Sequence, residues 1–454
     1  MSPGPDGPVS YRAAVEALEA RGRFGIRLGL GRTRALLHEL GDPQLAFRGA
    51  LVAGTNGKGS VLALAGSALR AAGVVAGETP KPHVVSYRER LMIGGQPIDP
   101  DTFARLVGEV LPVADRVARR HGDPTEFELL TGLIFRWFAE SNVRVALVEV
   151  GLGGRLDATH AWDGGVAVVT NVALDHMDRL GDTIPKIARE KAAIIERGDL
   201  AVTGATGDAL AVVRRRARRM GAPLREAEPA GILAIDRDGL LVTLPGLGDV
   251  RVGLRGRHQA ANVAVADGTL DALAEAGIVT VPPEARRRGY ASATWPGRLE
   301  LLVVGGRDVL LDGAHNPAGA EALATAIEDL RPSLTGGASA APPRLTLVVA
   351  SMADKDVAGV IRALRESAAV RDARIICTSL ALARALPAGD LAARWHAAGA
   401  TRLEAINDPG AALEAALATG DGPVVIAGSL YLVGEARARL VDDPRLRDPE
   451  DLPG

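Results

Sequence analysis

The chain has a single cysteine and no long apolar run. Cys377 is the one cysteine among 454 residues, so no disulfide can form within the chain. Apolar residues come in strand-length runs, whereas a membrane-spanning helix needs about 18 or more in succession. No charged-then-apolar leader opens the sequence. We therefore expect a cytoplasmic protein without a membrane partner.

Neither sign of charge is in excess. The formal net charge is −2, which argues against a nucleic-acid partner, because such proteins carry an excess of positive charge. The richest basic run, residues 214–219, is expected to form the solvated face of a helix rather than a phosphate-binding patch. We expect a monomer whose partners are small molecules.

Strand-length apolar runs alternate with helical patterns along the chain. In its first part, turn residues and then a helical pattern such as residues 184–195 follow the apolar runs. This alternation predicts an α/β fold with a mainly parallel sheet that is covered on both faces. The strands predicted here are residues 50–53, 143–150, 166–170 and 200–203.

The chain is longer than one hydrophobic core usually supports, so two domains are expected. The pattern breaks at residues 296–297, which predicts a first domain over 1–296 and a smaller second domain over 297–454. Residues 333–343, rich in Gly, Ala, Ser and Pro, are expected to form a flexible loop inside the second domain. The strands predicted there are residues 299–304, 309–312, 345–350, 374–378 and 424–427.

The strand at residues 50–53 runs into a glycine-rich turn that carries a lysine and a serine. Glycine can take positive φ, so such a turn directs successive N–H groups at phosphate oxygens, and the following helix adds positive potential. Lys58 would meet the outer phosphates of a nucleoside triphosphate, and the Ser60 hydroxyl is a ligand for Mg²⁺. Gly59, between them, departs from the strict P-loop spacing. The turn consists of Gly54, Thr55, Asn56, Gly57, Lys58, Gly59 and Ser60.

A second group of chemistry-bearing residues lies at the ends of predicted elements. Glu149 and His176 follow predicted strands, and Lys191 lies near the end of a predicted helix. Because the carboxyl ends of parallel strands meet at one edge of a sheet, Glu149 and Ser60 can lie close together. Taken singly, Glu149 could cap a turn, and His176 and Lys191 could be solvated surface residues. Together they predict Mg²⁺ ions placed against a transferring phosphate.

Several segments, long and in the expected order, resemble one known family. The resemblance extends from Phe24 to about Gly434, and the family is that of folylpolyglutamate synthase and dihydrofolate synthase, in the ATP-dependent Mur ligase superfamily. It implies a P-loop-type ATP-binding domain with a mainly parallel sheet, followed by a smaller Rossmann-like α/β glutamate-ligase domain. The segments are GTNGKGS (54–60), EVGLGGRLDAT (149–159), DH (175–176), EKA (190–192), PGRLE (296–300), LDGAHNP (311–317), DKD (354–356) and GSLYL (428–432).

The resemblance implies a ligase that joins a carboxylate to the amine of L-glutamate, and it implies roles for single residues. Ser60 and Glu149 would ligate one Mg²⁺, and His176 with Glu149 a second. Lys191 matches a lysine that relatives carry as a carbamate, which would turn a cation into an anionic oxygen ligand. The candidate catalytic residues are Lys58, Glu149, His176, Lys191 and His315.

Further residues would complete the site. By the same resemblance, Asn262 reaches the nucleotide, Arg298 reaches the phosphates and Asp312 holds the ribose. Arg298 could instead form a plain salt bridge in the linker. An arginine suits a carboxylate because its planar fork can bind both oxygens. The predicted glutamate pocket consists of Arg90, His315 and Ser429.

Lys81 departs from the family pattern. Relatives usually carry a serine here, near the first metal, and an ammonium group cannot ligate a cation. Either the Lys81 side chain turns away, or its charge takes over part of the metal's role by pairing with an ATP phosphate or with the acidic cluster at Glu149. We expect the second outcome, because Pro80 and Pro82 stiffen the loop.

Two other functions are compatible with a nucleotide site. A Mur ligase proper, which extends a nucleotide-linked cell-wall precursor, carries an additional amino-terminal domain; a phosphate loop at residue 54 leaves little room for one, and residues 24–30 resemble the folate family instead. A nucleotide-dependent switch protein would hydrolyse ATP with or without glutamate. For a ligase, the sequence leaves open whether the acceptor is dihydropteroate, a folate monoglutamate or both.

Overall fold

The structure is a computed structural model that describes residues 10–22, 29–339 and 342–449. Residues 24–28 of the family-like segment 24–30 therefore lie outside the described residues. The chain forms two compact units, the first from residues 1–229, 261–289 and 443–454, the second from 230–260 and 290–442. Residues 230–260 thus pack with the second unit, although they precede the proposed boundary at residues 296–297.

An eight-stranded sheet forms the centre of the first unit, in the order β4-β3-β2-β5-β1-β6-β7-β8. The six strands from β2 to β8 in this order run parallel, and β3 and β4 add an antiparallel edge. This confirms the predicted mainly parallel sheet. The strands are β1 (Arg48–Ala53), β2 (Ala76–Thr79), β3 (Met92–Ile93), β4 (Gln96–Pro97), β5 (Val145–Glu149), β6 (Gly165–Val169), β7 (Leu200–Thr203) and β8 (Leu224–Glu226).

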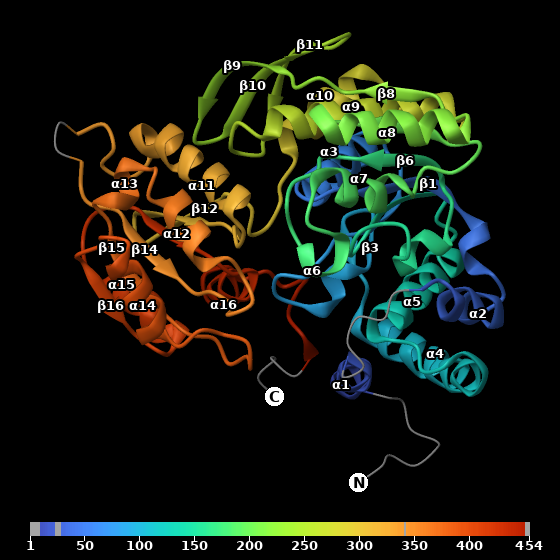
Figure 1. The fold of residues 1–454 in the computed structure, drawn as a ribbon, viewed down its shortest axis with the longest axis horizontal. Helices are drawn as coiled ribbons and strands as arrows, with labels where there is room; N and C mark the ends of the chain where they lie inside the picture. Colours follow the sequence, from blue (N-terminus) through green and yellow to red (C-terminus); the bar gives the residue numbers. More distant parts are fainter. Residues whose placement is uncertain (1–9, 23–28, 340–341, 450–454) are drawn as a thin grey trace. The chain divides into compact units, whose positions relative to one another are not determined.

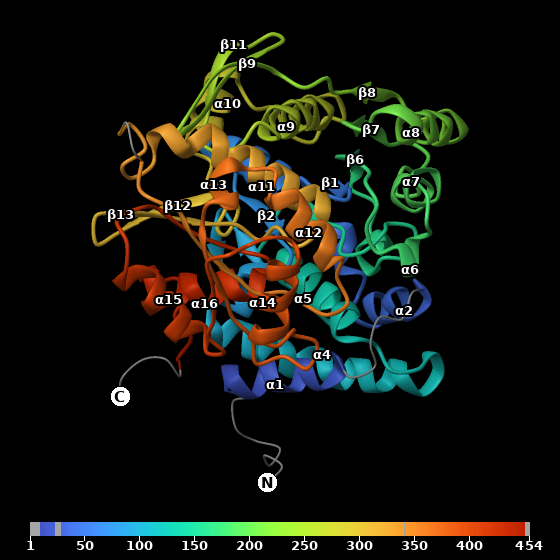
Figure 2. The same ribbon diagram turned by 60° about the vertical axis from the view of Figure 1, so that its left-hand side comes forward.

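Helices cover both faces of this sheet: α4 and α5 lie on one side and α8 on the other (Figures 1 and 2). Side-chain caps fix where the covering helices begin, as where Thr125 and Glu128 form a capping box at the start of α5. The helices are α1 (Tyr11–Gly22), α2 (Gly31–Glu39), α3 (Lys58–Ala71), α4 (Pro100–His121), α5 (Glu126–Glu140), α6 (Met177–Leu180), α7 (Ile184–Ala192), α8 (Gly207–Met220), α9 (Gln259–Glu275) and α10 (Pro283–Ser292), with short 3₁₀ helices η1 (Pro43–Ala46), η2 (Tyr87–Arg90) and η3 (Ala158–Ala161).

The core of the first unit is apolar and contains an aromatic cluster. The ring of Phe47, just before β1, lies 5.4–5.6 Å from the rings of three other residues. These are Phe135 and Phe138 of α5 and Trp162 of the loop before β6. Tilted and edge contacts of this kind stabilise a core beyond simple area burial. The core therefore ties helix α5 to the amino end of β1 and to the loop before β6.

The second unit contains two sheets. A six-stranded sheet in the order β12-β13-β17-β14-β15-β16 is parallel except for β12, and β9, β10 and β11 form a separate antiparallel sheet that the sequence did not predict. The strands are β9 (Gly231–Asp236), β10 (Gly239–Leu244), β11 (Gly248–Val252), β12 (Glu300–Val304), β13 (Arg307–Leu311), β14 (Thr346–Val349), β15 (Arg374–Cys377), β16 (Leu403–Ala405) and β17 (Val424–Ala427). The helices are α11 (Pro317–Leu330), η4 (Arg331–Ser333), α12 (Val357–Leu364), α13 (Ala368–Arg371), α14 (Ala388–Ala397), α15 (Pro409–Ala418) and α16 (Leu430–Leu440).

Two expectations from composition can be checked on the helices. In the described part of the chain, no helix combines the length and the apolar character that crossing a membrane requires. The basic run 214–219 lies on α8, where Arg214, Arg215, Arg218 and Arg219 are exposed and Arg214 pairs with Glu226. This run is therefore the solvated helical face that was predicted.

Candidate active site

The loop between β1 and α3 is fastened to the loop that follows β6. The N–H of Thr55 donates to the Asn171 carbonyl at 3.0 Å, and the N–H of Asn56 donates to Asn171 Oδ1 at 2.9 Å. The Thr170 hydroxyl donates to the Asn56 carbonyl at 2.7 Å. Asn171 was missed by the sequence analysis, although it directly follows a predicted strand and so obeys the same strand-end rule as Glu149.

Two lysines converge on the first carbonyl of this loop. Lys58 Nζ donates to the carbonyls of Gly54 at 3.1 Å and Thr55 at 3.2 Å. Lys191 Nζ, which reaches the loop from α7, donates to the Gly54 carbonyl at 2.9 Å. Lys191 is 4% exposed, and burial lowers its pKa to about 7. Lys191 is therefore part of the loop's surroundings rather than a solvated residue.

Glu149 ends strand β5, next to Val52 of β1 in the parallel register. The residue is 3% exposed, and its Oε1 lies 3.9 Å from Lys58 Nζ. Ser60, buried in the first turn of α3, belongs to the same region because the loop leads into that helix. The structure thus brings a carboxylate, a hydroxyl and two lysines to the carboxyl edge of the sheet.

His176 lies in a more open place than Glu149. It stands before α6 with a left-handed backbone, φ 48°, and its side chain is 44% exposed. Its Nε2 lies 3.9 Å from Asp175 Oδ2. His176 therefore remains accessible to a ligand that enters at this edge.

Arg90 closes η2 and is held on several sides. Its Nε donates to His83 Nδ1 at 2.8 Å, and its guanidinium lies 4.7 Å from the centre of the Tyr87 ring and 3.9 Å from Glu126 Oε1. Burial is the main cause that lowers the pKa of His83 to about 3, so this ring is a neutral acceptor. Arg90 is therefore positioned in advance rather than free to rotate.

In the second unit, predicted residues collect where β13 and β17 end. These strands run parallel with Leu311 beside Ile426, so Asp312 and Ser429 follow them at the same sheet edge. The Asp312 carboxylate accepts the N–H groups of Leu299 and Ala314, both at 2.9 Å. Burial raises the pKa of this carboxylate, and the positive charge of Arg298 opposes the shift.

The other predicted residues of this edge also make backbone contacts. Ser429 caps α16 by accepting the N–H of Tyr431 at 3.2 Å. His315 Nδ1 lies 2.8 Å from the Gly313 carbonyl. Both side chains are thus oriented by the backbone that carries them.

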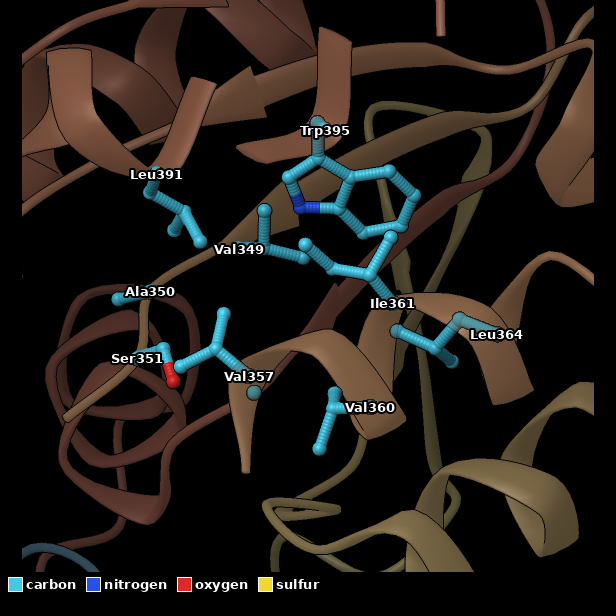
Figure 3. Close-up of a pocket in the computed structure, with 10 residues that line it drawn as sticks. Val349, Ala350, Ser351, Val357, Val360, Ile361, Leu364, Leu391 and Trp395 are labelled. Carbon is cyan, nitrogen blue, oxygen red and sulfur yellow. The ribbon is translucent and has the colours of Figure 1, made fainter. Parts of the chain in front are cut away.

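A small pocket near this edge has a different character. Figure 3 shows side chains from β14, α12 and α14 around it, with the Trp395 indole facing Val349 and Ile361 and with Ser351 as a polar group at its border. Its volume of about 10 Å³ holds at most one water molecule. This pocket belongs to the core of the second unit rather than to a substrate site.

Comparison with known proteins agrees with this geometry. The Mur ligase middle domain matches residues 52–270, and the Mur ligase glutamate ligase domain matches residues 297–430. The chain is 34% identical to the "Dihydrofolate synthase/folylpolyglutamate synthase" of Bacillus subtilis over 95% of this chain and 99% of that protein. It belongs to the folylpolyglutamate synthase and dihydrofolate synthase family.

Solved structures of this family have the same fold. The Mycobacterium tuberculosis folylpolyglutamate synthase complexed with ADP matches with a TM-score of 0.85 and 31% identity, over 95% of this chain and 99% of that one. E. coli FolC in complex with DHPP and ADP matches with a TM-score of 0.79 and 29% identity, over 96% and 99%. The two-domain Mur ligase fold is therefore shared along nearly the whole chain.

The residues at the loop fit an ion that is shared with a phosphate. Among the described residues, no three His, Cys, Asp or Glu side chains form a group that could hold a metal alone. Ser60 and Glu149 offer oxygen ligands, which Mg²⁺ prefers, and Mg²⁺ usually keeps waters and phosphate oxygens in its remaining positions. The donor set therefore suits Mg²⁺ brought with a nucleotide.

Lys81 lies against Glu149. Its N–H donates to Glu149 Oε2 at 3.0 Å, and its Nζ donates to the Glu149 carbonyl at 2.6 Å. Its ammonium also lies 4.7 Å from the centre of the Phe127 ring, and burial lowers its pKa to about 8. The Lys81 side chain has therefore turned toward Glu149 rather than away from it, and the role of its charge stays a prediction.

Variants of Lys81 test what its charge does. If the ammonium group supports the phosphate site, Lys81→Met should raise the KM for ATP by on the order of tenfold, because one cation is lost. Lys81→Ser should increase the dependence of turnover on free Mg²⁺. Titrations of ATP and Mg²⁺ measure both effects, with Lys186→Met, on the exposed side of α7, as the control. Unchanged titrations in both Lys81 variants would contradict this role.

Gly57 allows the loop to pass close to Asn262. Its φ is 82°, and a Cβ at this position would lie 2.3 Å from Asn262 Oδ1. We expect Gly57→Ala to weaken ADP binding at least about tenfold, because a left-handed alanine costs about 1–2 kcal/mol and Asn262 must also move. Calorimetric titration with ADP measures this. Gly73→Ala is the matched control, since Gly73 has φ 76° with no atom within 4 Å of its Cβ; equal effects in both variants would rule out the Asn262 contact as the cause.

Proposed function

We propose that this protein joins the amine of L-glutamate to the carboxylate of dihydropteroate and of folates, with ATP as the energy source. The observation that carries this proposal is the convergence of Lys58, Glu149 and Lys191 on the glycine-rich loop. It is supported by the near-complete coverage of a relative that is named for both activities.

The chemistry requires activation of a carboxylate. A carboxylate is a poor electrophile, so one of its oxygens attacks the γ-phosphorus of ATP, the bond to the β-phosphate bridge breaks and ADP leaves. The glutamate nitrogen then attacks the acyl carbon and loses a proton. The bond between that carbon and the phosphate oxygen breaks, and phosphate leaves. Neither step needs a protein nucleophile, so the protein contributes mainly position and charge.

The residues of the first unit are assigned to phosphate transfer. Lys58 and the N–H groups of residues 57–60, which lead into α3, hold the phosphates, and Asn262, buried in α9 beside Gly57, orients the nucleotide. Ser60, Glu149, His176 and a carbamate on Lys191 would hold Mg²⁺, as one or two ions, which when bound neutralises charge on the transferring phosphate.

The remaining roles are assigned to polar groups at two places. Arg90 of the first unit would bind a glutamate carboxylate with its planar guanidinium. In the second unit, Arg298 would contact phosphate, Asp312 the ribose, and His315 with Ser429 the glutamate.

The test measures each acceptor separately. Purified protein is incubated with ATP, Mg²⁺ and labelled glutamate, together with dihydropteroate or with a folate monoglutamate, and both ADP and labelled product are counted. The proposal expects ADP release that depends on glutamate and on the acceptor, with labelled product from both acceptors. ATP hydrolysis that is independent of glutamate would instead support a switch protein, and product from one acceptor alone would restrict the function to that acceptor.

A further inference from the structure

The segment that ends the described chain is fastened to the loop that carries Arg90. The Ser86 hydroxyl donates to Asp448 Oδ1 at 2.9 Å, and Arg88 Nε donates to the same oxygen at 3.2 Å. Arg88 Nη2 also donates to the Arg447 carbonyl at 2.9 Å. All these residues belong to the first unit, because the chain returns to it at Asp443.

Arg88 is a buried cation whose charge is compensated by this segment. The residue is 4% exposed, and its Nη1 donates to the Ile98 carbonyl at 3.0 Å. The carboxylate that pairs with it is Asp448. Because an unpaired buried guanidinium is costly, removal of the Asp448 charge favours a rearrangement of Arg88 over its present position.

The loop between Lys81 and Arg90 is otherwise tightly organised. The Glu89 carboxylate accepts the N–H groups of Val84, Val85 and Ser86, at 2.6–3.2 Å. A displacement of Arg88 therefore moves its neighbours as a group, and Arg90, two residues on in the same 3₁₀ helix, moves with them.

The same C-terminal stretch begins at a predicted substrate residue of the other unit. Ser429 caps the start of α16, this helix ends at Leu440, and the first-unit segment begins three residues later, at Asp443. One short piece of chain thus leads from Ser429 in the second unit to the anchor of the Arg90 loop in the first.

We propose that residues 443–449 form a C-terminal strap that positions Arg90 for glutamate, with Asp448 and Arg88 as positioning residues. This inference rests on the proposed function, in which Arg90 and Ser429 bind glutamate. The strap is fastened to the loop that carries Arg90, whereas the phosphate loop is fastened separately by Thr170 and Asn171. Loss of the strap should therefore affect glutamate far more than ATP.

The experiment compares Asp448→Asn and Asp448→Glu in the full-length chain. Asp448→Asn keeps the side-chain shape and removes its charge, and we expect the KM for glutamate to rise by roughly tenfold while the KM for ATP stays near that of the parent. Asp448→Glu should restore most of the glutamate affinity. The matched control is Asp372→Asn, which removes an exposed carboxylate paired with Arg344 and Arg402.

A pair of truncations gives a second measurement. A chain that ends at Asp442 lacks the strap and should show at least the same rise in the KM for glutamate, whereas a chain that ends at Pro449 retains it and should behave as the parent. An unchanged KM for glutamate in Asp448→Asn would contradict the proposed role of the strap. An equal rise in the KM values for glutamate and ATP, together with a lower melting temperature, would contradict it as well. If the parent itself shows no glutamate-dependent turnover, the proposed function fails instead, and with it this inference.

Discussion

Glu149→Ala is expected to lower turnover by on the order of a hundredfold or more, because it removes the buried carboxylate that faces the phosphate loop. Glu149 lies at the end of a central strand, and its side chain compensates the charge of Lys58 3.9 Å away. Steady-state turnover with ATP, glutamate and dihydropteroate measures the effect, and thermal unfolding reports whether the fold is retained.

Glu149→Gln separates charge from shape. The amide oxygen of glutamine can still accept the N–H of Lys81, so the loop contact is retained while the negative charge is lost. A loss of turnover in both variants supports a role in binding Mg²⁺. Parent-level turnover in Glu149→Ala at ordinary Mg²⁺ concentrations would refute it.

Lys191→Ala is expected to be nearly inactive and to regain part of its activity when a short carboxylate such as acetate is added. An unmodified ammonium beside Mg²⁺ would repel it and could not ligate it, whereas a carbamate supplies oxygen ligands. Carbamate formation needs the neutral amine, and a pKa of about 7 makes that form abundant in neutral solution and more so as the pH rises.

Lys186 provides the control for this experiment, since it lies on the same helix with an exposed side chain paired to Asp182. Lys186→Ala should keep the parent's activity and should not respond to acetate. Mass spectrometry of the native protein under bicarbonate is the independent check. A fully active protein with an unmodified Lys191 would show that the carbamate is absent from this chain.

The main strands were predictable because their apolar runs are buried on both faces. The run at residues 200–203 is an example, since β7 has the predicted bounds and its last three residues are buried. The sheet of β9, β10 and β11 was not predictable in the same way. Strand β9 is largely exposed, and its apolar residues Ile232 and Leu233 face solvent, so it lacks the contrast between faces that marks a strand.

The site was predictable to the extent that it depends on strand order. Glu149 and Lys58 lie close together because strands β1 and β5 are parallel neighbours, which the sequence pattern indicates. The contact between Lys191 and Gly54 depends instead on how α7 packs, and spacing along the chain carries no information on that. The contact between the Lys81 ammonium group and the Phe127 ring likewise depends on how helix α5 packs.

The division of the chain into two units limits how the gene can recombine. The backbone passes between the units after residues 229, 260, 289 and 442, so each unit is assembled from separated stretches. A fragment that starts at residue 297 would leave β9, β10 and β11 behind, and one that ends at residue 296 would lack Asp448. No single crossover in the gene therefore exchanges one intact unit.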